Sequence, residues 1–203
     1  MTVLTKELYA SLVYLDRDFL AGRYEIQSGE SPHSQVTKTQ TKKAGAAIPI
    51  FSAEVSAVET RAYPISTLEM LAVVLPVLEA EPRLAPKQFE KRMSSMLGWV
   101  DGYLSTLTVS MSKKKPGTDD YVSSEEQGYF TLENQAELKL ALITSPDYFL
   151  SGLDTLTKMH KVAVRDLAIP VRALVRVIAA QSHADQWIAV PYVIFEQKST
   201  NRT

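Results

Sequence analysis

The amino-acid sequence predicts an α+β domain with a mainly antiparallel sheet of about five or six strands and about four helices. Two observations support this class. Segments that alternate apolar and polar residues are frequent in the second half of the chain, and other segments have apolar residues at helical spacing. The two kinds do not alternate regularly enough for a doubly wound parallel sheet. With 203 residues, 45% of them hydrophobic, we expect a single domain over residues 1–203.

The first predicted elements are a strand and a helix near the N-terminus. Residues 8–15 are aromatic and apolar, as is typical of a strand. Asp16 follows as a candidate N-cap, and Phe19, Leu20 and Tyr24 then recur at helical spacing. This order predicts a strand that leads directly into a short helix.

Two polar stretches and the C-terminal tail are predicted to lack stable structure. Residues 28–45 and 113–127 contain few apolar side chains, so burial cannot offset the entropy cost of ordering them. We therefore expect a mobile loop in each, and a frayed tail over residues 197–203. Weak alternation over residues 46–60 favours a further strand after the first loop.

The clearest predicted helix begins after Ser66. Ser66 and Glu69 have the spacing of a capping box, and apolar residues continue at helical spacing to Leu78. Pro76 lies inside this segment and predicts a kink or an early end, because proline removes a hydrogen bond of the helix. A second helix is predicted over residues 86–98, since proline is favoured in a first turn and glycine after a last one.

The second half of the chain is predicted to hold most of the sheet. Residues 103–111 and 136–142 alternate in hydrophobicity, so we expect two paired strands joined by the polar loop. Residues 145–161 begin with Ser-Pro-Asp and continue with an apolar stripe, which predicts a helix. The β-rich segments 169–180 and 187–195 predict an antiparallel hairpin. The last segment is apolar on both sides, which is typical of a central strand or of a surface for a partner or a second copy.

The composition excludes several classes of functional site. There is no cysteine, so disulfides, thiol catalysis and cysteine-containing zinc sites are absent. The three histidines, at positions 33, 160 and 183, lack the short spacings with which imidazoles converge on a metal, and we expect no metal ion. Neither GxGxxG nor GxxxxGK[ST] occurs, so we expect no classical nucleotide site. The sequence indicates no cofactor and no catalytic residue.

Three arginines are the candidate residues for binding an anionic ligand. A strand over residues 169–180 places Arg172 and Arg176 on one face with Leu174 between them, and Arg165 lies upstream. The alternate residues Val171, Ala173, Val175 and Val177 are then expected to face the core. Solvent-exposed arginines without a ligand are the alternative reading of this stripe.

Charge and hydropathy limit the partners and the location. The chain has 22 basic and 23 acidic residues, a formal net charge of −1, so nucleic acid is not an expected partner. No stretch reaches the length of a membrane span, and the N-terminus lacks the features of a signal peptide. The sequence therefore predicts a cytoplasmic protein whose partner is another protein, a second copy of itself or a small anionic ligand.

The residues Val13-Tyr14-Leu15-Asp16, followed by a polar stretch, a capped helix and a β-rich second half, resemble a family of uncharacterised bacterial proteins that open with a YLD strand. This resemblance implies a bacterial cytosolic protein and assigns no catalytic residue. The leading interpretation is a non-catalytic binding or interaction protein. The alternatives are an anion or nucleotide sensor that uses the arginine stripe, and a hydrolase-like enzyme that uses scattered acidic and histidine residues.

Overall fold

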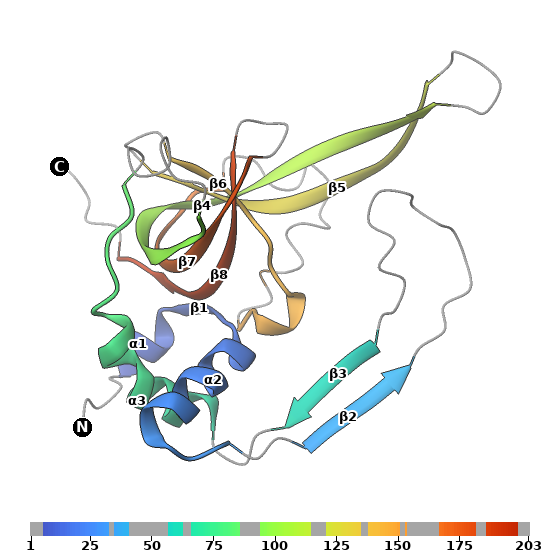
Figure 1. Ribbon diagram of the computed structural model, residues 1–203. Coiled ribbons are helices and arrows are strands. Elements are labelled where there is room, and N and C mark those ends of the chain that lie inside the picture. Colours follow the sequence, from blue (N-terminus) through green and yellow to red (C-terminus); the bar gives the residue numbers. More distant parts are fainter. Residues whose placement is uncertain are drawn as a thin grey trace.

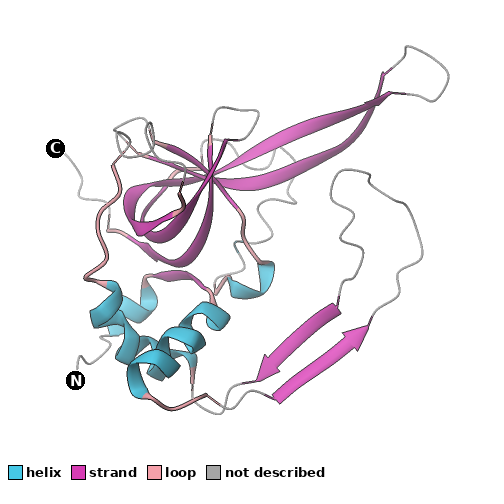
Figure 2. Ribbon diagram, in the orientation of Figure 1, coloured by secondary structure: helices cyan, strands magenta, loops and turns pink. Residues whose placement is uncertain are grey.

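A computed structural model describes residues 6–32, 35–40, 57–62, 66–85, 94–114, 121–134, 138–150, 153, 167–181 and 186–198. Within these ranges the chain forms a six-stranded, mainly antiparallel sheet, a separate two-stranded sheet and three α-helices (Figure 1, Figure 2). The α+β class and the antiparallel sheet are confirmed. The three described α-helices are fewer than the sequence predicts.

The sheet closes into a small barrel. In chain order the elements are α1 (Lys6–Ala10), β1 (Leu12–Leu15), α2 (Arg17–Ser28), β2 (Gln35–Gln40), β3 (Ala57–Ala62), α3 (Thr67–Leu78), β4 (Met96–Lys114), β5 (Tyr121–Glu133), β6 (Lys139–Leu142), the 3-10 turn η2 (Pro146–Tyr148), β7 (Ile169–Gln181) and β8 (Trp187–Glu196). The barrel strands run in the order β8-β6-β5-β4-β7, and pairing of β7 with β8 closes the circle. Only β6 and β8 are parallel. Strand β1 pairs with the last part of β8.

Strand β4 joins two neighbours in succession. Residues 96–104 pair with β7, and residues 103–114 pair with β5. Around the change of partner the chain packs too closely for a side chain: a Cβ at Gly98 would lie 2.4 Å from the carbonyl oxygen of Pro82, and one at Gly102 would lie 2.4 Å from that of Glu133. Glycine is therefore required for these close approaches.

Several predicted boundaries are wrong, for one shared reason. Residues 96–98, predicted to end a helix, begin β4, and residues 121–127, predicted as part of a loop, belong to β5. Residues 35–40 of the other predicted loop form β2, paired with β3. In each case the segment forms a strand because its backbone hydrogen-bonds to a partner strand that is polar or distant in the sequence. The hydrophobicity of the segment itself does not indicate such a partner. Strand β5 also lies between β4 and β6, which were predicted to pair directly.

The structure also bears on three other segments predicted from the sequence. Within the predicted helix 145–161, the described residues 145–150 form the turn η2, after which Phe149 is extended and bridges to Tyr14, and most of residues 151–161 lie outside the described part of the chain. Residues 86–93, the start of another predicted helix, lie outside the described residues. Gln197, in the predicted frayed tail, donates its backbone N–H to the carbonyl of Pro170 at 2.7 Å.

The two predicted helix caps are confirmed. Asp16 accepts a hydrogen bond from the backbone N–H of Phe19 at 2.9 Å, and Ser66 and Glu69 form a reciprocal capping box. Helix α3 continues through Pro76 to Leu78. No helix among the described residues is long and apolar enough to cross a membrane.

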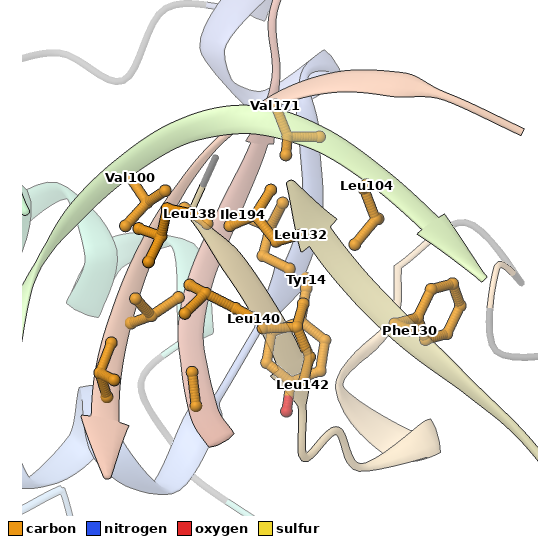
Figure 3. Close-up of a cluster of buried hydrophobic side chains, with 14 of the residues drawn as sticks. Tyr14, Val100, Leu104, Phe130, Leu132, Leu138, Leu140, Leu142, Val171 and Ile194 are labelled. Atoms are coloured by element: carbon orange, nitrogen blue, oxygen red, sulfur yellow. The ribbon is translucent and has the colours of Figure 1, made fainter. Parts of the chain in front are cut away.

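Two apolar clusters hold the domain together. The first fills the barrel, where the residues predicted to face the core from β7 lie with Leu104, Phe130 and Leu140 (Figure 3). The second lies outside the barrel, where α2 and α3 cover Trp99, Leu174 and other residues of β4, β7 and β8. Strand β7 is thus buried on its barrel-facing side, and on its other side Leu174 is buried under the helices. Apolar side chains fill the barrel interior, so a polar ligand would have to bind on the surface.

Candidate functional site

Arg172, the first arginine of the predicted stripe, is part of an internal contact between helix and barrel. Its guanidinium donates two hydrogen bonds to the Glu79 carboxylate, at 3.0 and 2.6 Å, and its Cζ lies 4.1 Å from the centre of the Trp99 ring. Glu79 follows α3, and the Arg172 side chain is 24% exposed. The bidentate ion pair engages both terminal nitrogens of Arg172, and its Nε is buried, so Arg172 holds α3 against the barrel.

Arg176, the second predicted arginine, has a different environment. It is exposed, and its Cζ lies 5.9 Å from the centre of the Tyr192 ring. No carboxylate of the described residues forms an ion pair with it. Arg165, the third candidate, lies outside the described residues. Of the two described arginines of the stripe, Arg176 is therefore the one that presents a guanidinium to solvent.

The structure reveals an aromatic pair beside Arg176. The rings of Phe19 and Tyr192 stack with centres 3.8 Å apart and planes 9° from parallel. The Cζ of Arg23 lies 5.3 Å from the centre of the Phe19 ring. Contacts therefore run in series from Arg23 through Phe19 and Tyr192 to Arg176, and we call these four residues the arginine-aromatic column.

A β-bulge positions the column. Leu174 pairs with Val193 while the next residue, Val175, pairs with Pro191, so Tyr192 is the extra residue of β8. Bulges redirect a side chain from the regular alternation of a strand. The backbone carbonyl of Tyr192 also accepts a hydrogen bond from the N–H of Asp16 at 2.8 Å, which ties the bulge to the start of α2. The stacked partner Phe19 comes from the first turn of that helix.

Three of the four column residues were not predicted as site residues from the sequence. Phe19 and Arg23 are four residues apart on α2, a spacing that places them on one helix face and is visible in the sequence. Tyr192 has no such signal, because a regular alternation in β8 does not reveal the bulge. Phe19 and Tyr192 are far apart in the sequence, and only the fold brings their rings together.

Each ring of the column has an arginine near it. The Cζ atoms of Arg23 and Arg176 lie 5.3 and 5.9 Å from the ring centres, within the range of a cation–π contact, and this contact does not use the N–H donors of the guanidinium. Arg23 has a loose ion pair with Glu81 at 3.7 Å, which partly offsets its charge. Arg176 has no such partner among the described residues, so its positive charge is less offset than that of Arg23.

A second polar cluster lies where α2 begins. The Tyr148 hydroxyl donates a hydrogen bond to the Asp18 carboxylate at 2.5 Å, and the Arg17 guanidinium donates to the backbone carbonyl of Asp147 at 2.9 Å. The Tyr14 hydroxyl accepts from the N–H of Ser145 at 3.3 Å. These bonds join the N-terminal turn of α2 to residues 145–148. Burial is the main cause that raises the pKa of Tyr14 and of Tyr148.

The Asp16 carboxyl in this cluster allows a test of its role as a cap. Burial, opposed by the hydrogen bond from Phe19, raises its pKa above the ordinary value of 3.8. The folded protein therefore binds a proton here more tightly than the unfolded chain, and ionised Asp16 lowers stability at neutral pH. We expect Asp16→Asn, which keeps an N-cap acceptor, to be at least as stable as the wild type at neutral pH.

The same difference should change with pH in a defined direction. As pH falls through the raised pKa towards 3.8, wild-type Asp16 becomes protonated and its penalty disappears, so the wild type gains stability relative to Asp16→Asn. Urea denaturation of both proteins between pH 7 and pH 4 measures this difference. Asp16→Ala is the control that removes the cap, and relative to Asp16→Asn it should cost about 1 kcal/mol at every pH. A wild type that instead loses stability relative to Asp16→Asn on acidification would contradict a raised pKa.

Neither the metal-ligating side chains of the described residues nor comparison with known proteins indicates a further site. No group of three or more Asp, Glu or His side chains among the described residues could hold a metal ion, and all three histidines lie outside those residues. Comparison of the chain with protein-family models, with curated proteins and with solved structures gives no match.

Proposed function

We propose that this protein is a non-catalytic binding protein that holds a small phosphate-bearing anion at Arg176. The observation that carries the proposal is the exposed guanidinium of Arg176 beside the Tyr192 ring, with no ion-pair partner among the described residues. A guanidinium offers paired N–H donors that match two oxygens of a phosphate group. The packed barrel supports a surface site over an internal one.

This proposal favours one of the functions that the sequence left open. Arg172 is engaged by Glu79, so the anion site is centred on one arginine of the stripe, with Arg23 at the far end of the column as a second positive charge. The hydrolase-like alternative gains no support from the acidic cluster, because Asp16 caps α2 and Asp18 accepts from Tyr148. A bacterial, cytoplasmic location remains part of the proposal and rests on the sequence resemblance.

Replacing Arg176 by glutamine tests the proposal. Thermal unfolding is followed while inorganic pyrophosphate is added, because a ligand of the native state raises the unfolding temperature. We expect pyrophosphate to raise the unfolding temperature of the wild type, and Arg176→Gln to weaken its affinity about tenfold or more through loss of charge-assisted hydrogen bonds.

Arg83→Gln is the matched control. It removes one positive charge from a side chain that is 73% exposed and paired only at the surface with Asp101. We expect this variant to bind pyrophosphate like the wild type, with the same salt dependence. The proposal is wrong if the wild type shows no shift, or if the two variants lose affinity equally, because the effect would then reflect net charge alone.

A further inference from the structure

The hairpin of β4 and β5 extends beyond the barrel as a two-stranded arm (Figure 1). Pairing of β4 with β7 stops at Leu104, and pairing of β5 with β6 begins only at Phe130. Beyond these points, β4 and β5 pair with each other and with no third strand among those described. Each strand of the arm therefore has an outer edge on which no described strand lies.

The two outer edges differ in how well their sequences resist pairing with another chain. The edge of β5 has Glu125 and Glu126, and it is interrupted by a bulge: Ser110 pairs with Glu126 while Met111 pairs with Ser124. Charges and bulges are features that protect an edge strand from association. Residues 105–112 of β4 read STLTVSMS and contain no charge, no proline and no glycine. The β4 edge thus lacks these protective features over residues 105–112, and its first charges are Lys113 and Lys114 at the end of the strand.

The β4 edge is also chemically self-complementary. Read in both directions from Val109, the segment has Thr108 and Ser110, then Leu107 and Met111, then Thr106 and Ser112. A hydroxyl residue is matched with a hydroxyl residue and a long apolar residue with another. Two antiparallel copies centred on Val109 would place like with like at each pair, a favourable arrangement for cross-strand neighbours.

We propose that a second copy of this chain pairs with the β4 edge, antiparallel and centred on Val109, to form a two-fold symmetric dimer. The two arms then make one four-stranded sheet in the order β5-β4-β4-β5. Lys113 of each copy faces Ser105 of the other, so like charges are not directly opposed. Such a dimer gives a marginal two-stranded ribbon the additional strands that stabilise it, and its symmetric interface closes without forming fibres.

This dimer is independent of the proposed anion site. Arg176 lies on β7, and the dimer interface lies on residues 105–113 of β4. Failure of the dimer experiment would therefore leave the pyrophosphate experiment unaffected, and the reverse also holds.

Val109→Lys tests the symmetric pairing by placing two like charges opposite each other at the axis. Sedimentation equilibrium should show a dimer for the wild type and loss of the dimer for Val109→Lys. Gln127→Lys is the matched control, because Gln127 pairs with Val109 within the same hairpin but lies one strand farther from the axis. This control should remain dimeric. Mixing Val109→Lys with Val109→Glu should restore a dimer between the two different chains.

A covalent test covers the case in which a charged variant fails to fold. The chain contains no cysteine, so a single introduced cysteine can form a disulfide only with another molecule. Opposed residues of antiparallel strands have Cα separations that suit a disulfide. Under mild oxidation Val109→Cys should form a covalent dimer in high yield, and Gln127→Cys should not. A monomeric wild type, a dimeric Val109→Lys, or equal cross-linking of the two cysteine variants would overturn the proposal.

Discussion

Replacing Trp99 by alanine is expected to lower the free energy of unfolding by about 3–5 kcal/mol. The Trp99 side chain is 1% exposed and packs in the apolar cluster between the helices and the barrel. Its indole N–H donates a hydrogen bond to the carbonyl of Leu78 at 2.7 Å, at the end of α3. Truncation would remove this bond, leave a cavity and take away the ring beneath Arg172.

Comparison with Trp99→Phe separates the contributions of that side chain. Phenylalanine keeps an aromatic ring near Arg172 but leaves the Leu78 carbonyl without its indole donor, so we expect a smaller loss of roughly 1–3 kcal/mol. Guanidinium denaturation followed by circular dichroism is the suitable measurement, because Trp187 also contributes to fluorescence. If both variants lose less than about 1 kcal/mol, Trp99 does not join the two layers as described.

Replacing Gly102 by alanine is expected to cost about 2–3 kcal/mol or more. A Cβ at this position would lie 2.4 Å from the carbonyl oxygen and 3.0 Å from the carbonyl carbon of Glu133. Both atoms belong to the backbone of β5, so no side-chain rotation can relieve the clash. The two strands would have to separate at the point where β4 changes partner, which would weaken the closed barrel.

Gly22→Ala is the control for this substitution. Gly22 lies inside α2, where an added Cβ would meet no atom within 4 Å. The same chemical change should therefore stabilise the protein by about 0.5–1 kcal/mol, because alanine loses less conformational entropy than glycine on forming a helix. Thermal unfolding of the two variants should show shifts of opposite sign. A stabilising Gly102→Ala would contradict the close approach of β4 and β5.

Local signals were read correctly from the sequence where the interacting groups are close along the chain. Asp16 and Phe19 are three residues apart, as are Ser66 and Glu69, and both caps form as expected. The alternation of β7 correctly predicted that Val171 and its alternate neighbours face a core. In each case the backbone geometry of one helix turn or one strand is enough to place the side chains.

The candidate site was predictable only in part. The arginine stripe was visible in the sequence, yet the two arginines have different environments because Arg172 meets Glu79, a residue on another element, and Arg176 meets Tyr192. The Tyr192 side chain leaves the regular alternation at a bulge, which depends on how β8 pairs with β7. A property that depends on the partner strand is not encoded in local spacing.

The sequence alone thus determined the α+β class, the starts of α2 and α3, and the hairpin of β7 and β8, because propensity, capping and alternation act over a few residues. The tertiary structure decided that five strands close into a barrel, that the polar residues 121–127 extend β5, and that Phe19 stacks on Tyr192. These features depend on backbone hydrogen bonds and packing between segments far apart in the chain, and such contacts form only when the whole fold brings those segments together.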